Sequence, residues 1–383
     1  MTPLPQGFKE MINNLLGDEG AALIEVLDTP PVTSIRLNKR KPGADFSEST
    51  LVPWCVSGRY LDRRPEFILD PLLHAGAYYV QDASSMIYET VMERIVEKLS
   101  DKTPVKFLKV LDLCAAPGGK TTAMINAIPD GSEVIANEYS PKRVGALKEN
   151  LEKWGYRNVS VTNKDTKFYA QIEDEYDVVA VDAPCSGEGM MRKEEIARTQ
   201  WTPSLIEQCS ILQKDILSNA VKALKPGGFL IYSTCTFNRR ENEDNAEYIV
   251  GEWNLQPVDL CFPEEWQIPG GIDTELPVYR FMPHKTKGEG LFLALFRKPG
   301  DWEPSPRRKD SSNLSFPSEE YPEVDVDKET ALAYLRRESI TLPPETPKGL
   351  VTITYKSLPL GPAKNIGSRA NNLYPKNRRI LKR

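Results

Sequence analysis

A glycine-containing turn between an apolar run and a helix constrains the fold of this chain more than any other feature. The apolar run Val105 to Leu111 is followed by DLCAAPGGKTT, residues 112–122. Gly118 and Gly119 carry no side chain, so a ligand can approach the backbone N–H groups of the turn and of the helix that follows. Such a turn is typical of nucleotide-binding α/β proteins, and two classes of protein build it.

One class has the phosphate-binding pattern G-x-x-x-x-G-K-[ST]. Residues 114–121 match it except at the first position, where Cys114 replaces a glycine whose conformational freedom is normally needed. The other class is the S-adenosylmethionine turn of class I methyltransferases, which needs an acid after the next strand to bind a ribose diol. Glu138 ends the strand-like segment 133–138, about 20 residues beyond the turn, where that acid is expected. The methyltransferase turn is therefore favoured.

The rest of the chain predicts alternating strands and helices. Ser140 and Pro141 predict the start of a helix that runs to Trp154. The segment 176–182 is almost entirely apolar, as buried parallel strands are. Further strands are expected at 158–162, 229–233 and 291–296. We therefore expect an α/β, Rossmann-like fold with a mixed, mostly parallel sheet covered by helices on both faces.

Two cysteines follow two of the predicted strands. Asp182 and Cys185 follow the strand at 176–182, and Cys235 follows the strand at 229–233. Ligands of open α/β sheets bind beyond the carboxyl ends of the strands, so both thiols are expected near the glycine turn. A lone free cysteine is often a small buried hydrophobe, but two at neighbouring strand ends favour a reactive pair.

Three segments carry a family resemblance: DLCAAPGGKTT, DAPCSGEGMMRK and YSTCTFNRRENE. With Glu138 and Asp165, they resemble the Nop/Sun (Fmu) family of RNA cytosine-5 methyltransferases, over about residues 30–297. The resemblance implies a class I S-adenosylmethionine methyltransferase fold with a small N-terminal α/β RNA-binding subdomain and a small C-terminal RNA-binding domain. It also implies the residues that bind S-adenosylmethionine or the reacting centre: Cys114, Ala115, Ala116, Pro117, Gly118, Gly119, Lys120, Glu138, Asp165 and Asp182.

The same resemblance implies that Cys235 is the nucleophile, that Cys185 assists product release and that Asp182 contacts the reacting base. Addition of a thiolate to carbon 6 of cytosine makes carbon 5 enamine-like and divides one difficult step into two easier ones. Asp182 on ring nitrogen 3 would offset the charge that develops in the ring. DNA cytosine-5 methyltransferases use a cysteine in a Pro-Cys setting such as that of Cys185, so residue chemistry alone leaves the choice of nucleophile open.

Other chemistries have little support in the sequence. The two histidines, His74 and His284, are far apart, and no two of the six cysteines lie within four residues of each other, so we expect no metal site. There is no signal-like leader and no run of 18 apolar residues. We expect no membrane contact, a reducing cytoplasmic setting for the thiols and a monomer.

The family resemblance and the composition together imply four parts in the 383 residues. They are an N-terminal RNA-binding subdomain (1–75), a methyltransferase domain (76–298), a proline-rich linker (299–325) and a basic C-terminal RNA-binding domain (326–383). Basic residues of the first part are candidates for RNA contact or for an ordinary solvated face: Arg36, Lys39, Arg40, Lys41, Arg59, Arg63 and Arg64. Beside Cys185, Arg192 and Lys193 are candidates for the RNA backbone, and Met190 and Met191 for a flipped base.

Charge is distributed unevenly. The chain has a net charge of −5, yet the segment 346–383 holds nine basic residues and no acidic one, so the remainder carries −14. A basic block behind an acidic body suggests that this end of the chain binds phosphates without reading sequence. We expect a strand at 351–355 and a base stacked on Tyr374. The alternative is a disordered, solubilising tail.

These observations favour transfer of a methyl group from S-adenosylmethionine, without a metal, to carbon 5 of a cytosine in RNA. The expected substrate is 16S (small-subunit) rRNA, with tRNA as the alternative. Two other classes remain open at this point. One is a P-loop-like ATPase, in which Lys120 and Thr121 bind phosphate and magnesium. The other is a catalytically silent RNA-binding or ribosome-assembly protein, which would need neither thiol.

Overall fold

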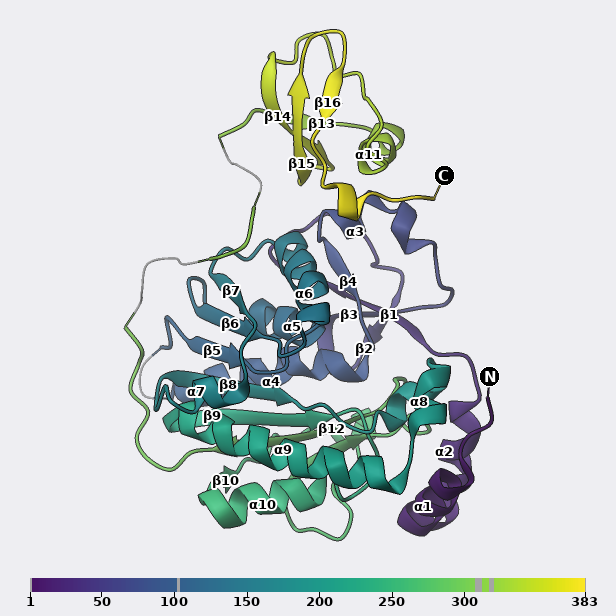
Figure 1. Cartoon of the computed structure of the whole chain (residues 1–383), viewed down its shortest axis with the longest axis vertical. Helices are drawn as coiled ribbons and strands as arrows, with labels where there is room; N and C mark the ends of the chain where they lie inside the picture. Colours follow the sequence, from purple (N-terminus) through teal and green to yellow (C-terminus); the bar gives the residue numbers. More distant parts are fainter. Residues whose placement is uncertain (1, 102–103, 307–311, 317–319, 383) are drawn as a thin grey trace.

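The structure is a computed structural model of the chain and describes residues 2–101, 104–306, 312–316 and 320–382. These residues form three β-sheets, and the C-terminal sheet lies at one end of the long axis (Figure 1). Within these residues, no helix is long and apolar enough to cross a membrane.

The largest sheet has the strand order β10-β12-β9-β8-β5-β6-β7, with β11 paired to β12. Its strands are β5 (Lys109–Asp112), β6 (Glu133–Asn137), β7 (Val159–Thr162), β8 (Tyr176–Asp182), β9 (Leu224–Thr234), β10 (Gln256–Pro257), β11 (Val278–Phe281) and β12 (Leu291–Arg297). Strands β5 to β9 run parallel, whereas β12 is antiparallel to β9. The expected α/β fold with a mixed, mostly parallel sheet is confirmed.

Helices cover both faces of this sheet. One face packs against α4 (Ile87–Leu99), α5 (Gly119–Ala127) and α6 (Pro141–Trp154), and the other against α7 (Thr166–Tyr169), α9 (Pro203–Ala223) and α10 (Glu243–Trp253). Strand β5 shows the alternation: Val110 packs on the first face and Leu111 on the second. Short elements complete this part: η3 (Ser84–Met86), η4 (Glu188–Arg192), α8 (Glu195–Gln200) and η5 (Glu264–Trp266).

Two predicted elements, α6 and β8, have the bounds expected from the sequence. Strand β9 begins at Leu224 and not at the expected Phe229, because Leu224 already pairs with Tyr176 of β8. The register shifts after that pair, and Gly227 takes a left-handed conformation with φ +71° within the shifted segment. Glycine adopts that conformation without strain, so the strand continues through the Pro-Gly-Gly sequence.

The N-terminal part is a helical hairpin followed by an antiparallel sheet of order β2-β3-β1-β4. Its elements are α1 (Gln6–Leu16), η1 (Gly17–Glu19), α2 (Gly20–Leu27), β1 (Thr33–Leu37), β2 (Thr50–Val52), β3 (Cys55–Leu61), η2 (Phe67–Leu69), α3 (Pro71–His74) and β4 (Tyr78–Val80). The boundary expected after residue 75 falls inside this sheet, because Tyr78 of β4 pairs with Leu37 of β1.

Four of the basic residues considered for RNA contact instead hold this part against the catalytic part. Arg36 is fully buried and donates to Gln81 Oε1 (2.8 Å) and to the carbonyl of Thr122 (3.1 Å). The other three make ion pairs or hydrogen bonds across the same interface, Lys39 with Glu89, Arg40 with Asp130, and Lys41 with the carbonyl of Lys153. The expectation that these residues contact RNA is therefore wrong for Arg36, whereas Arg63 and Arg64 are exposed.

The C-terminal part is a sheet of order β13-β14-β15-β16 with one helix. Its elements are β13 (Glu323–Asp325), α11 (Lys328–Leu335), β14 (Gly349–Tyr355), β15 (Leu358–Asn365), β16 (Ala370–Asn372) and η6 (Lys376–Arg378). The boundary expected at residue 326 is displaced, because β13 pairs with β14. The strand expected at 351–355 is present, so a disordered tail is the wrong description. Tyr374 is buried against Tyr334, with ring centroids 5.4 Å apart, and cannot stack on a base.

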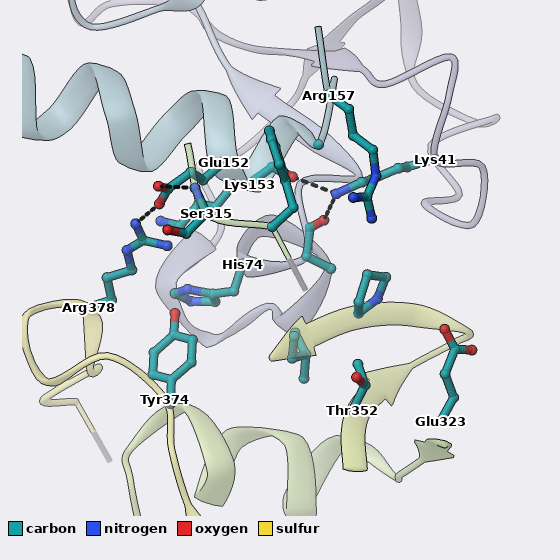
Figure 2. A pocket seen from close by; sticks show the side chains of 15 residues that line it. Lys41, His74, Glu152, Lys153, Arg157, Ser315, Glu323, Thr352, Tyr374 and Arg378 are labelled. Carbon is teal, nitrogen blue, oxygen red and sulfur yellow. Dashed lines mark hydrogen bonds and ion pairs between the residues drawn. The ribbon is translucent and has the colours of Figure 1, made fainter. Parts of the chain in front are cut away.

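The C-terminal part is docked on the other two. Its apolar core is continuous with that of the N-terminal sheet, since Leu72 and Tyr78 pack in one cluster with Tyr334 and Val351. A cavity of about 300 Å³ lies at this junction. Figure 2 shows the side chains that line it, with Arg378 paired to Glu152 of α6.

The segment expected to be a linker also contacts the central sheet. Trp302 Nε1 and Ser305 Oγ each donate to the buried carboxylate of Asp177, both at 2.9 Å. Asn313 donates to the carbonyl of Val161 in β7 (2.6 Å). The described part of 299–325 is therefore packed along the sheet and is not a free spacer.

We predict that Arg36→Met lowers the free energy of unfolding by roughly 3 kcal/mol, because buried acceptors at the domain interface lose their donor. The exposed Arg63→Met is the matched control and should change stability by less than about 0.5 kcal/mol. Urea denaturation followed by tryptophan fluorescence measures both. A stable Arg36→Met protein with weakened RNA binding would restore the RNA-contact interpretation of Arg36.

Candidate active site

The glycine turn joins β5 to α5. Gly118 has φ +105° and precedes the first helical residue, so the turn uses a conformation that only glycine adopts freely. Side chains of α6 hold the turn from outside: Asn150 donates to the carbonyl of Pro117 (2.9 Å) and Arg143 donates to that of Ala116. Ala115 N–H donates to the carbonyl of Asn137 (2.8 Å), which fixes the turn beside β6.

Burial raises the pKa of two residues at the start of the turn. Cys114 lies at the start of the turn, and burial raises the pKa of its thiol well above the ordinary value. Asp112 ends β5 and accepts a hydrogen bond from Thr121 Oγ1 (2.6 Å). Burial raises the pKa of Asp112 to about 7, against the lowering effect of that hydrogen bond. The Cys114 thiol is therefore neutral at pH 7, and the Asp112 carboxyl is about half protonated.

Glu138 follows β6 and is only 4% exposed. Its Oε1 accepts from Ser140 N–H (2.8 Å), and Arg143 lies 3.3 Å from Oε2. Oε2 nevertheless has no hydrogen-bond donor among the described residues. A buried carboxylate oxygen without an aligned donor fits a ribose hydroxyl, so the residues present fit the cofactor that the turn implies.

Asp165 has a structural task that the sequence did not predict. It is the N-cap of α7, and its Oδ1 accepts from Lys167 N–H (2.9 Å). The side chain is exposed at the end of β7, beyond Asn137 and Glu138 of the neighbouring strand. A contact of Asp165 with the cofactor stays a prediction.

Asp182 ends β8 and is held at both carboxylate oxygens. Lys120 Nζ lies 2.8 Å from Oδ2, and Ser233 Oγ donates to Oδ1 (2.7 Å). Burial of Lys120 acts to lower its pKa, but Asp182 outweighs this and the pKa is raised, so the ammonium stays charged. Burial also raises the pKa of Tyr88, whose hydroxyl lies 2.8 Å from Ser233 Oγ. The Asp182 carboxylate is thus held on one side by the Ser233 hydroxyl, which the Tyr88 hydroxyl contacts in turn, and on the other side by the Lys120 ammonium.

The two strand-end thiols meet. Strands β8 and β9 pair in parallel, with Asp182 opposite Ser233, and the loops beyond them place Cys185 Sγ and Cys235 Sγ 3.3 Å apart. Both cysteines are free. The hydrogen bond with Cys235, together with burial, raises the pKa of the Cys185 thiol well above its ordinary value.

In the loop after Cys185, the expected contacts of Arg192 with the RNA backbone and of Met191 with a flipped base are both wrong. Arg192 is buried and donates to the carbonyls of Pro30 (2.8 Å) and Gly288 (3.2 Å), so it holds the N-terminal segment and cannot contact RNA. Met191 is fully buried in the core around α1 and α2. Lys193 is exposed and Met190 half-buried, so their predicted contacts with RNA remain predictions.

Sequence reasoning missed several residues that shape the site. Tyr88 lies on the buried face of α4, and no pattern separates it from ordinary core residues. Glu188 and Glu241 are fully buried carboxylates inside the quoted motifs, where a charged residue among glycines and small polar residues is a weak signal. Within the described residues, no three His, Cys, Asp or Glu side chains gather as metal ligands do.

Family models match almost the whole chain. Residues 102–297 match the model described as 16S rRNA methyltransferase RsmB/F. Residues 4–83 match the N-terminal domain of 16S rRNA methyltransferase RsmF, and 321–380 match the methyltransferase RsmF PUA domain. The match to the N-terminal domain ends beyond β4, and the match to the PUA domain begins before β13. Both limits agree with the strands that belong to the N-terminal and C-terminal sheets.

Relatives and solved structures that resemble this chain are also named as methyltransferases or as a methyltransferase homolog. A ribosomal RNA small subunit methyltransferase F of Shewanella amazonensis is 36% identical, covering 69% of this chain and 58% of the relative. The protein of the same name from Cronobacter sakazakii is 32% identical, covering 79% and 65%. The chain thus spans about three fifths of the length of these relatives. A methyltransferase homolog protein from Pyrococcus horikoshii superimposes with a TM-score of 0.65 at 25% identity, covering 77% of this chain and 95% of that one.

We predict an effect of Asp112 on the pH dependence of stability. With a folded pKa of about 7 and an unfolded value near 4, the folded state binds this proton more tightly, so stability falls as pH rises between about 4 and 7. Asp112→Asn removes that loss. The variant should therefore gain stability relative to the parent across this interval and keep a constant advantage above it. Urea denaturation at several pH values measures the difference, and a difference independent of pH contradicts the prediction.

Proposed function

The chain belongs to the 16S rRNA methyltransferase RsmB/F family, and from that we propose that it methylates carbon 5 of a cytosine in RNA, with small-subunit rRNA as the substrate. The observation that carries the proposal is the pair of free thiols 3.3 Å apart beside Asp182, at adjacent strand ends over the glycine turn. An RNA-binding protein without catalysis needs no such pair.

The cofactor in this proposal is S-adenosylmethionine, which supplies the methyl group when bound. Glu138 Oε2 would accept from a ribose hydroxyl, and the backbone between Cys114 and Lys120 would line the cofactor. Asp165 and Asp182 complete the proposed set. The match of residues 102–297 to a methyltransferase model favours this interpretation of the turn over a phosphate-binding loop.

The proposed roles of the two thiols are those that the family resemblance implies. Because its pKa is raised, Cys185 keeps its proton and can donate it to a thiolate on Cys235. Attack on carbon 6 of the base needs a thiolate, and in this proposal Cys235 supplies it, as the family resemblance implies. After methyl transfer, a base must take the proton from carbon 5, and Cys185 is close enough to assist as Cys235 leaves.

Asp182 is proposed to contact ring nitrogen 3 of the cytosine. Ser233 and Lys120 hold its carboxyl group in one orientation before the base arrives. A proton taken from water and shared between this carboxyl group and nitrogen 3 would offset the negative charge that thiolate addition brings into the ring. Tyr88 supports Ser233 from inside the fold. A cytosine that is paired in RNA must be flipped or presented unpaired to reach this site.

The proposed RNA contact includes a basic hollow on the C-terminal part. Arg336, Arg337, Lys376 and Arg379 line it, and Glu338 pairs with Arg336. Arg379 also borders a second hollow that reaches Arg64 of the N-terminal part. Basic side chains from both ends of the chain thus lie on one continuous surface, which suits the phosphates of a folded RNA.

We predict that Cys185→Ala accumulates a covalent RNA–protein adduct with S-adenosylmethionine present, because attack proceeds while release is slowed, by about 10²-fold or more. Cys235→Ala should form no adduct, and Cys209→Ala is the matched control and should behave as the parent. Denaturing gels with labelled cofactor and total RNA or ribosomal subunits measure this. The opposite pattern makes Cys185 the nucleophile, adducts with tRNA alone change the substrate, and no label transfer at all overturns the proposed function.

We also predict that Lys376→Ala and Arg379→Ala together weaken RNA binding and lower the slope of log affinity against log salt by roughly 1–2, because phosphate contacts are lost. The exposed pair Lys348→Ala and Lys364→Ala removes the same charge from the same part of the chain outside the hollow. Filter binding over a series of salt concentrations measures both double variants. Equal slopes in the two would show that the hollow is not the contact.

A further inference from the structure

Two buried glutamates connect the loops that carry the thiols. Strand β8 ends at Asp182 and β9 at Thr234, so the ladder between them stops before either cysteine. The position of Cys185 relative to Cys235 therefore depends on contacts between the two loops. We call the reciprocal contacts of Glu188 and Glu241 the carboxylate clasp.

Glu188 belongs to the chain segment of Cys185 and binds the segment of Cys235. Its Oε2 accepts from the backbone N–H groups of Phe237 (2.6 Å) and Asn238 (3.0 Å). Its Oε1 accepts from Trp201 Nε1 (2.9 Å). The side chain is fully buried, so all of these bonds lie away from water.

Glu241 makes the converse connection, from the segment of Cys235 to that of Cys185. Its Oε2 accepts from the backbone N–H of Ser186 (3.0 Å) and from Gln213 Nε2 (2.7 Å). Asn238 Nδ2 donates to Oε1 of Glu241 (2.8 Å) and also to Oε1 of Glu188 (3.1 Å), so it joins the two carboxylates. Glu241, too, is fully buried.

Such an arrangement is costly unless every acceptor is satisfied. A buried carboxylate is stable only with several donors, and each of these has at least three. Gln213 also donates to the carbonyl of Pro184 (2.9 Å), and Gly189 N–H to the carbonyl of Cys235 (2.9 Å). The backbone is therefore held on both sides of Cys185, and at Cys235 and the residues that follow it. The clasp therefore restricts both loops where the strands no longer do.

We propose that Glu188 and Glu241 are positioning residues for the thiol pair: through reciprocal bonds to the backbone of the opposite loop, they hold Cys185 Sγ within reach of Cys235 Sγ. Neither glutamate contacts a thiol. For catalysis, and resting on the proposed function, the clasp keeps Cys185 in place to assist release after Cys235 has added to the base.

The positioning of the two thiols can be measured without RNA, from the ease with which Cys185 and Cys235 form a disulfide. This equilibrium gives the effective concentration of one thiol at the other. Oxidised dithiothreitol takes two electrons from the pair, the two thiols lose two protons and form a sulfur–sulfur bond, and reduced dithiothreitol is released. The equilibrium constant of this exchange is measured on folded protein in a Cys261→Ser background, since Cys261 is an exposed free thiol. Circular dichroism reports folding in the same samples.

We expect Glu188→Gln and Glu241→Gln each to lower the equilibrium constant at least tenfold. The glutamine side chain replaces one acceptor oxygen by an NH2 group, which then faces N–H groups of the opposite loop that have lost their acceptor. Asp177→Asn is the matched control: it is a fully buried carboxylate of β8 at the opposite end of the strand. It should reduce thermal stability and leave the thiol equilibrium unchanged. If the glutamine variants do not fold, Gln213→Met, which removes one donor to Glu241, should give a reduction of several-fold.

Two outcomes overturn the proposal: an unchanged equilibrium constant in the folded clasp variants, or an equal loss in Asp177→Asn. With RNA, the clasp variants should prolong the covalent adduct and leave the KM for RNA unchanged, which a general loss of stability would not do. If the parent transfers no label to RNA at all, the proposed function fails, whereas the thiol equilibrium still decides whether the clasp positions the pair.

Discussion

The parallel pairing of β8 with β9 is the constraint on which the site depends. It sets Asp182 opposite Ser233, so that a carboxylate and a hydroxyl meet at the end of one ladder, and two thiols follow one step further. Lys120 reaches the same point from α5 because β5 is the other neighbour of β8. The chemistry of the site thus comes from three adjacent strand ends, and helices on both faces keep those strands in register.

The fold of the catalytic part could be predicted from the sequence because its signals are local. The glycine turn, the Ser-Pro start of α6 and the apolar strand β8 each identify an element within a few residues, and the parallel order then brings Cys185 and Cys235 together. Glycine and proline predict the wrong strand boundary where pairing with a neighbouring strand outweighs their local preference. Strand β9 was expected to begin after Pro-Gly-Gly, but it runs through these residues because Leu224 already pairs with Tyr176.

What could not be predicted is the environment of charged and aromatic side chains. Arg36 and Arg192 have the same local sequence character as exposed basic residues, but long-range contacts bury them against carbonyls. Tyr374 fills a core with Tyr334 and does not face solvent. The boundaries at 75 and 325 were misplaced for a related reason, since β4 and β13 pair with strands beyond those positions. Glu188 and Glu241 were missed because a buried carboxylate is recognised only by its donors.

The shared core of the first and last sheets has a consequence for the order of synthesis. The face of the N-terminal sheet that packs on Tyr334 and Val351 is made early, and the residues that cover it leave the ribosome almost 300 residues later. Domains that emerge first normally fold as units, but here residues of the N-terminal part such as Phe67 and Leu72 supply only part of the cover for the apolar side of the first sheet. The hydrogen bond of Arg36 with α5 holds the N-terminal sheet to the catalytic part, and it leaves the surface that faces the C-terminal part uncovered. A nascent chain that ends before residue 320 therefore exposes apolar side chains that the complete core buries.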